Sequence, residues 1–211
     1  MKTKDWIFIL LGSGILISLI VLIARRSPAS PRPLTSQATS TDDHHKPQPT
    51  DDAVFKTLLN NPAPDFSLVD YNGRTVSLKS LQGKNVLLFF NEGLMCYPAC
   101  WNQIVAFGKD TDLKKAGVTV LNITVDAKSR WAEAIAKMPE LAPATVLFDQ
   151  DKKVSTGYGV LTLASSMHRG QFPGHTYVLI DKNGEVKFTW DDPQMAVRNS
   201  ELLAKINDLP R

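Results

Sequence analysis

The first apolar run of the chain extends from Trp6 to Ala24 without a charged residue. Its nineteen residues, at ~1.5 Å rise per residue, roughly match the ~30 Å hydrocarbon core of a bilayer, so the run predicts a transmembrane helix. A cleaved signal peptide is the alternative, but its apolar region is only ~7–15 residues long and ends at a small-x-small site. This run is longer and meets Arg25 and Arg26. We therefore expect residues 1–26 to form an uncleaved anchor.

Polar residues dominate the next segment, Ser27–Asp52, which also contains five prolines. This composition cannot bury enough surface to offset the entropy of ordering the chain, so residues 27–52 are expected to form a disordered linker. A short helical pattern begins at Ala53, and residues 53–211 suffice for one α/β domain.

Within this domain, short β-type runs alternate with amphipathic stretches. Strands at Phe66–Val69 and Thr75–Leu78 flank a turn that ends in Asn72-Gly73, which predicts a β-hairpin. The run Val86–Phe90 is short and wholly apolar, which is typical of a strand covered on both faces. The remaining pattern predicts strands at Val118–Asp126, Ala144–Asp149, His175–Asp181 and Glu185–Trp190, and helices at Cys100 to about Lys115, Trp131–Met138 and Ser200–Ile206. Such alternation implies an open, mostly parallel sheet that ends in a hairpin.

Charge and cysteine content narrow the function classes. The net charge of +3 arises from 24 basic and 21 acidic residues without a basic stripe, which argues against nucleic-acid binding. The two cysteines, Cys96 and Cys100, cannot form the multi-bridge framework of small secreted domains. They lie between the strand Val86–Phe90 and the following helix, so we interpret them as a reactive pair.

Several motifs of the domain match one family. They are the start PAPDF at residues 62–66, the turn Asp70–Gly73, the step LQGK at residues 81–84, the apolar strand before the cysteines, and YVLIDKNGEV at residues 177–186. From Pro62 to Ile206 the chain resembles the peroxiredoxin-like redoxins, which include alkyl hydroperoxide reductases and thiol-specific antioxidants. The resemblance implies a thioredoxin fold, with an N-terminal β-hairpin and a central mixed sheet flanked by helices.

The family places its reactive cysteine in the first turn of the helix after the central strand. That position favours the thiolate over the thiol, because a helix N-terminus carries unpaired N–H groups and a partial positive charge. The family pattern Thr-Pro-x-Cys puts the peroxidatic cysteine at Cys100, with Tyr97 in place of the threonine. The family's arginine before the Thr-Phe strand has no counterpart directly before Thr176, and the nearest arginine is Arg169.

Two other functions remain open for the C-x3-C motif. A thiol-disulfide oxidoreductase, resembling the membrane-anchored thioredoxin-like proteins of the cell envelope, would use Cys96 as the nucleophile and Cys100 to resolve the mixed disulfide. Thiol-disulfide exchange and peroxidase activity are the two functions that we favour equally, and we expect neither to need a cofactor. The alternative is a Sco-like copper chaperone with Cys96, Cys100 and His175 as ligands, since soft thiolates and imidazole suit Cu(I).

Further residues are expected to support the cysteine pair. Pro98 shapes the loop, Trp101 covers the disulfide or packs in the core, and His175 and Thr176 begin the strand that faces the cysteines. By contrast, we interpret Glu92 as an exposed loop carboxylate.

The expected substrates are peroxides or protein thiols and disulfides, with a separate protein as the reductant. The apolar run predicts a single-pass protein of the cell membrane. By analogy with anchored redox domains, the domain is expected on the extracytoplasmic side.

Overall fold

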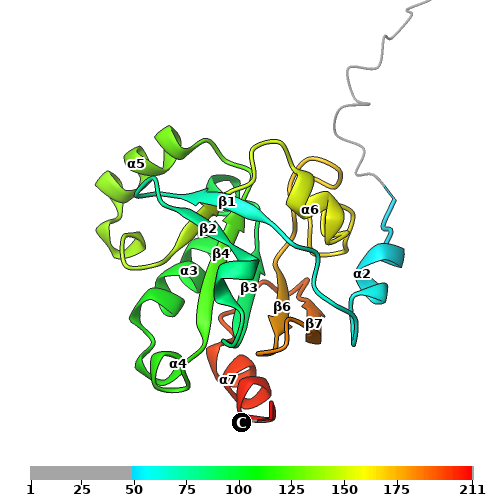
Figure 1. Cartoon of the computed structure of the whole chain (residues 1–211). Helices are drawn as coiled ribbons and strands as arrows, with labels where there is room; N and C mark the ends of the chain where they lie inside the picture. Colours follow the sequence, from blue (N-terminus) through cyan, green and yellow to red (C-terminus); the bar gives the residue numbers. More distant parts are fainter. Residues whose placement is uncertain (1–48, 211) are drawn as a thin grey trace, which may run out of the picture. The chain divides into compact units, whose positions relative to one another are not determined.

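The computed structural model describes residues 49–210, and the seven strands within them form one sheet in the order β2-β1-β5-β4-β3-β6-β7 (Figure 1). The strands are β1 (Ser67–Asp70), β2 (Thr75–Ser77), β3 (Val86–Phe90), β4 (Thr119–Thr124), β5 (Val146–Phe148), β6 (Thr176–Ile180) and β7 (Val186–Asp191). The α-helices are α2 (Ala53–Thr57), α3 (Ala99–Lys109), α4 (Thr111–Lys115), α5 (Lys128–Lys137), α6 (Lys153–Gly157) and α7 (Asn199–Asn207). Short 3-10 helices are η2 (Leu78–Leu81), η3 (Gly93–Met95) and η4 (Pro139–Leu141).

The sheet is mixed, as the family resemblance implies, and not mostly parallel, as the alternation of strands and helices predicts. Strand β4 lies parallel to β3 and to β5, whereas the pairs β1–β2, β1–β5, β3–β6 and β6–β7 are antiparallel. The prediction of a mostly parallel sheet was wrong because β1, β2, β6 and β7 enter as hairpins at the two edges. Tight turns can join only antiparallel neighbours.

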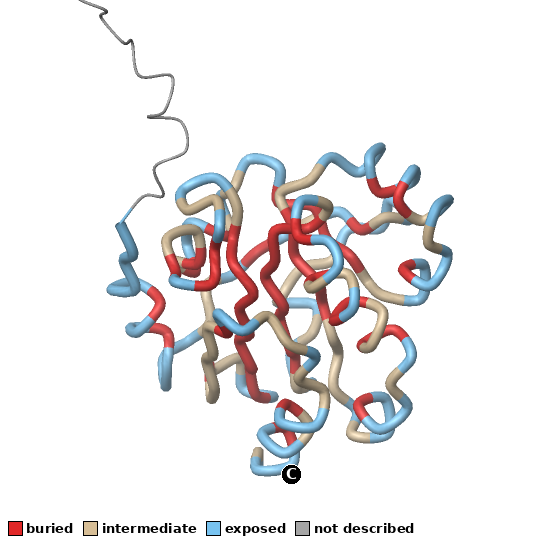
Figure 2. Tube along the Cα trace, turned by 180° about the vertical axis from the view of Figure 1, so that it is seen from behind, coloured by how far each residue is buried: buried red, intermediate tan, exposed pale blue. Residues whose placement is uncertain are grey.

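Both faces of the central strands are covered, which explains their apolar sequences. All five residues of β3 are buried, and Figure 2 shows several buried stretches running through the centre of the domain. Leu88 and Phe90 belong to a core cluster with α2 and Tyr158. Leu87 and Phe89 belong to a second cluster with helices α3, α5 and α7. The helix that carries Cys100 therefore packs on this second face.

The predicted N-terminal hairpin is confirmed. Leu68 pairs with Val76 in the register of β1 and β2. At the turn, Gly73 adopts φ +83°, which costs a glycine little. The buried carboxylate of Asp70 accepts hydrogen bonds from the backbone N–H and the Nε of Arg74.

One predicted helix is divided in two. The stretch from Cys100 to Lys115 forms α3, which ends at Lys109, and the separate helix α4. Asp110 has extended backbone angles, and its side chain accepts from the backbone N–H groups of Asp112 and Leu113. It therefore caps α4 and ends α3, as aspartate at an N-cap commonly does.

The predicted anchor and residues 27–48 of the predicted linker lie outside the described residues. Within residues 49–210, no helix has the length and apolarity needed to cross a membrane. The division at residues 26 and 52 stays a prediction.

Candidate functional site

The two cysteines lie where β3 passes into α3. Cys96 follows η3, and Cys100 is the second residue of α3. The pair forms a disulfide with a Cα–Cα distance of 5.4 Å. Both side chains are buried, at 2% and 0% exposure, whereas their neighbours Met95 and Tyr97 are 54% and 69% exposed. The buried disulfide is therefore flanked at the surface by two exposed apolar side chains, Met95 and Tyr97.

The N-terminus of α3 suits a reactive thiol at Cys100. Pro98 occupies the N-cap position, and no side chain caps this end of the helix. No acidic residue lies in the first turn either. The partial positive charge of the helix terminus is thus available to stabilise a thiolate at Cys100.

His175 reaches Cys100 from directly before β6. Its Nδ1 lies 3.7 Å from the sulfur of Cys100, and its ring packs edge-on against Phe89. Burial is the main reason that the pKa of His175 falls to about 4, while Asp192 and a backbone hydrogen bond with Ala196 act in the opposite direction. The imidazole beside the disulfide is therefore neutral at pH 7.

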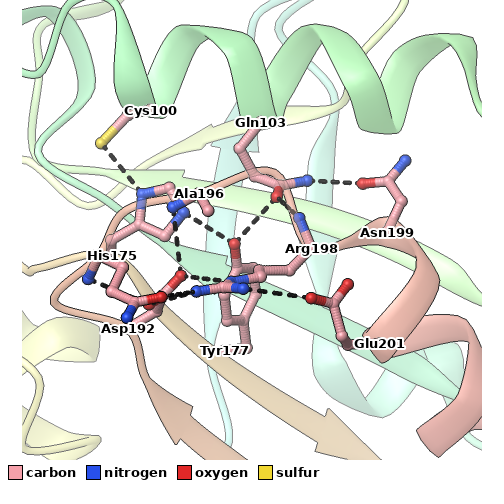
Figure 3. A network of polar contacts seen from close by, with 10 residues as sticks. Cys100, Gln103, His175, Tyr177, Asp192, Ala196, Arg198, Asn199 and Glu201 are labelled. Carbon is pink, nitrogen blue, oxygen red and sulfur yellow. Dashed lines mark hydrogen bonds and ion pairs between the residues drawn. The ribbon is translucent and has the colours of Figure 1, made fainter.

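The other ring nitrogen of His175 begins a buried polar network (Figure 3). His175 Nε2 lies 2.8 Å from the hydroxyl of Tyr177, and this hydroxyl donates to Gln103 Oε1 at 3.0 Å. Gln103 Nε2 donates to Asn199 Oδ1 at 2.7 Å. The network thus connects β6, α3 and α7 beneath the disulfide.

A second group of contacts shapes the loop between β7 and α7. Burial tends to raise the pKa of Asp192, but its hydrogen bonds and ion pair with Arg198 hold it below the usual value. The same carboxylate accepts from two backbone N–H groups of its own loop. In this loop Met195 adopts φ +50°, and its sulfur lies 4.0 Å from the sulfur of Cys96. The loop thus contacts Cys96, whereas His175 contacts Cys100.

The remaining residues predicted for the site divide into two groups. Trp101 donates from Nε1 to the carbonyl of Gly93 and packs edge-on against Tyr97, so it supports the cysteine loop. Thr176 does not join the site. Its hydroxyl contacts Asp191, because alternate residues of a strand point to opposite faces and His175 occupies the face toward α3.

Glu92 is buried, at 1% exposure, and its interpretation as an exposed loop residue was wrong. One carboxylate oxygen accepts from the backbone N–H groups of Met167 and His168 and from the hydroxyl of Ser166. The other oxygen lies 2.9 Å from Nδ1 of His168. Glu92 therefore fixes the 166–168 loop beside the cysteine loop. Arg169 follows in that loop and donates to the carbonyl of Ser166.

The sequence contains signals for some of the residues that the prediction missed. Tyr177 lies two positions after His175 on a strand and hence on the same face. Gln103 lies one helical turn after Cys100. Nothing local indicates Met195 or Arg198, which enter from a loop about a hundred residues away in sequence.

Comparison with known proteins identifies the family. The model of the AhpC/TSA family matches residues 59–189, more than half of the chain. The chain belongs to the AhpC/TSA family. The predicted resemblance to alkyl hydroperoxide reductases and thiol-specific antioxidants is thereby confirmed.

Individual AhpC/TSA relatives agree with this assignment. Peroxiredoxin Bcp of Escherichia coli K12 is 36% identical over 138 residues, covering 62% of this chain and 83% of that protein. The chloroplastic peroxiredoxin Q of Sedum lineare is 33% identical over 163 residues, covering 74% and 81%. The reduced 2-Cys peroxiredoxin of Plasmodium vivax superposes with a TM-score of 0.59 at 26% identity, covering 71% and 80%. The thioredoxin-type fold is thus confirmed, and the chain is an enzyme of the thiol peroxidase and oxidoreductase class.

The predicted membrane localisation requires correction. Its only support, the run Trp6–Ala24, lies outside the described residues, and the described part of the chain has no helix able to cross a membrane. The AhpC/TSA relatives are peroxiredoxins, and the match to them rests on the domain. Length and apolarity are necessary for a membrane span but do not establish one. The prediction of a single-pass membrane protein with an extracytoplasmic domain was therefore wrong.

Proposed function

We propose that the enzyme is a peroxiredoxin-like thiol peroxidase in which Cys100 is the peroxidatic cysteine and Cys96 the resolving cysteine. The observation that carries this proposal is the position of Cys100. It lies in the first turn of α3, bonded to Cys96 and 3.7 Å from Nδ1 of His175. Only one of the two cysteines has both a helix N-terminus and a nearby base.

The oxidative half of the cycle uses both sulfurs. The Cys100 thiolate attacks a hydroperoxide, so that an S–O bond forms, the O–O bond breaks, and the alkoxide takes up a proton and leaves as an alcohol. Cys100 is then a sulfenic acid. The Cys96 thiolate attacks the Cys100 sulfur, an S–S bond forms, and the hydroxide released takes up a proton to become water. The Cα–Cα distance of 5.4 Å lies within the usual range for disulfides.

Thiol-disulfide exchange forms the reductive half. We propose that a protein dithiol attacks Cys96, because the exposed residues Met95 and Tyr97 flank this sulfur. The S–S bond breaks, a mixed disulfide forms at Cys96, and Cys100 leaves as a thiolate stabilised by α3. The partner's second thiol then releases reduced Cys96. Peroxide reduction and thiol-disulfide exchange, the two functions expected from the sequence, are thus the two halves of one catalytic cycle.

The copper alternative gains no support from the comparisons, which lead to peroxiredoxins. Its three ligands, Cys96, Cys100 and His175, do lie together. Joined as a disulfide, however, the two sulfurs offer no thiolate to Cu(I).

Single cysteine variants of the full chain test the peroxidase proposal. Pre-reduced protein is mixed with hydrogen peroxide, and both peroxide loss and sulfenic acid trapped by dimedone are measured. Wild type should consume peroxide without a trapped adduct, and Cys96→Ser should consume it and form the adduct at Cys100. Cys100→Ser should fall to the background rate. Peroxide consumption that survives in Cys100→Ser would overturn the proposal.

The reductive half is tested on the oxidised wild type. A thioredoxin-type protein that lacks its own resolving cysteine traps the mixed disulfide, and peptide mapping locates it. The expected position is Cys96. A bond to Cys100 would contradict the order proposed for exchange.

A further inference from the structure

The polar network beneath the disulfide begins at a group that can only accept hydrogen bonds. Burial tends to raise the pKa of Asp110, but hydrogen bonds from Leu113, Asn199 and Asp112 hold it below its usual value, so it is a carboxylate at neutral pH. Its Oδ2 lies 2.6 Å from Asn199. The group of Asn199 that faces it must therefore be the NH2, and Oδ1 of Asn199 points to Gln103.

The orientation of the Gln103 amide follows from two independent contacts. Asn199 Oδ1, an acceptor, is 2.7 Å from one end of the amide, which must be the NH2. The backbone N–H of Arg198, which can only donate, is 2.8 Å from the other end. Oε1 of Gln103 is thus the atom that faces the Tyr177 hydroxyl.

The Tyr177 hydroxyl has one proton to donate, and Gln103 determines where it goes. Directed elsewhere, it would leave two oxygen lone pairs facing each other at 3.0 Å. The proton therefore lies toward Gln103, and the Tyr177 oxygen is left to accept from Nε2 of His175 at 2.8 Å. The ring proton of neutral His175 is then on Nε2, and Nδ1 presents a lone pair to Cys100.

We infer that this chain of hydrogen bonds, from Asp110 to Tyr177, holds His175 as the Nε2–H tautomer and makes Nδ1 the proton acceptor for the Cys100 thiol. Its catalytic consequence rests on the proposed function. The pKa of about 4 describes His175 beside the neutral disulfide. Beside a thiolate the opposite charge favours the imidazolium, so the thiol proton can move to Nδ1 and leave a thiolate–imidazolium pair. After the thiolate attacks a hydroperoxide, the imidazolium returns that proton to the leaving alkoxide. Tyr177 and Gln103 act through His175 and are positioning residues.

The tautomer is measured without any peroxide. The oxidised full chain is labelled with 15N-histidine, and long-range 1H–15N correlation at pH 7 separates protonated from unprotonated ring nitrogens. The four histidines of the chain are distinguished by the signals that His175→Asn removes. We expect a protonated Nε2 and an unprotonated Nδ1 for His175. A protonated Nδ1 and an unprotonated Nε2 would overturn the inference.

A pair of tyrosine variants tests the positioning role. Tyr177→Phe removes the hydroxyl but keeps the ring that stacks on Phe89. Tyr158→Phe is the matched control, because Tyr158 is an equally buried tyrosine of the other core cluster and its hydroxyl donates to the Pro64 carbonyl at 2.7 Å. In a Cys96→Ser background, the alkylation rate of Cys100 by iodoacetamide at pH 7 should fall about 2-fold or more with Tyr177→Phe, because only the Nε2–H tautomer can accept the thiol proton.

In Tyr177→Phe the two tautomers should also both appear, whereas Tyr158→Phe should keep the wild-type tautomer and alkylation rate. Equal losses in both variants, or none with Tyr177→Phe, would overturn the positioning role. These readouts also separate this inference from the proposed function. If the expected tautomer and rates are found but no peroxide is consumed, the peroxidase proposal fails while the Cys100–His175 pair stands.

Discussion

Among single residues, Glu92 shows how a buried charge can organise a site that it does not enter. A carboxylate removed from water is costly unless hydrogen bonds replace its hydration. Two backbone N–H groups, a hydroxyl and His168 supply those bonds. All of these donors come from the 166–168 loop. The hydrogen bonds that replace the hydration of Glu92 therefore also fix the position of this loop.

The variant Glu92→Gln tests this role. The amide keeps one acceptor oxygen but loses the charge, and charge-assisted hydrogen bonds contribute about 1.5–3 kcal/mol. We expect the free energy of unfolding in urea to fall by about 2 kcal/mol. Glu133→Gln, at an exposed position of α5, should change it by less than about 0.5 kcal/mol. Equal effects of the two variants would contradict the role given to Glu92.

At the scale of elements, the turn between β3 and α3 is fixed by contacts with the end of β4. Burial raises the pKa of Asp126, although its hydrogen bonds act in the opposite direction. Its carboxylate accepts from the backbone N–H of Leu94 and from the indole of Trp131. Gly93 lies against the same carboxylate with φ +58°, and a Cβ there would meet Asp126 and Thr124.

Two glycine variants separate backbone strain from this close contact. Gly93→Ala introduces both, whereas Gly117→Ala, at φ +69°, introduces only the strain because nothing lies within 4 Å of the added carbon. The left-handed conformation costs about 1–2 kcal/mol in each, and overpacking adds about 1–3 kcal/mol to Gly93→Ala alone. Urea unfolding should therefore show a larger loss for Gly93→Ala. Equal losses of unfolding free energy in the two variants would mean that the β3–α3 turn shifts to accommodate the added carbon, and would contradict the role given to this contact.

For the molecule as a whole, acid sensitivity follows from burying His175 without charge. Its pKa is about 4 in the folded protein and ~6.5 in an unfolded chain. Between these values the unfolded state binds more protons, so stability falls as the pH falls from about 6.5 to about 4. The loss from this one group reaches at most ~3 kcal/mol.

The difference in unfolding free energy between wild type and His175→Asn isolates this contribution from the carboxylates. Measured in urea at several pH values, the difference should be largest near pH 7 and shrink toward pH 4. A difference that stays constant over this range would show that His175 titrates normally in the folded protein.

Local patterns were enough to predict the hairpin at Asp70–Gly73, the buried strand Val86–Phe90 and the cysteines at a helix start, because periodicity and turn chemistry act over a few residues. The end of α3 was missed because Asp110 caps the next helix, a choice that the amphipathic pattern does not reveal. The burial of Glu92 and the contacts of His175 depend on partners about 75 residues away. Contacts between residues so far apart in sequence depend on the order in which the strands assemble into the sheet, which local patterns do not reveal.

The disulfide of four-residue separation also bears on how the enzyme would withstand excess oxidant. Because Cys96 is tethered beside Cys100, its effective concentration is set by the chain and does not change on dilution. A second peroxide molecule must compete with Cys96 for the sulfenic acid at Cys100. In the proposed cycle, irreversible over-oxidation of Cys100 to the sulfinic acid would therefore require a peroxide concentration high enough to outrun an intramolecular reaction.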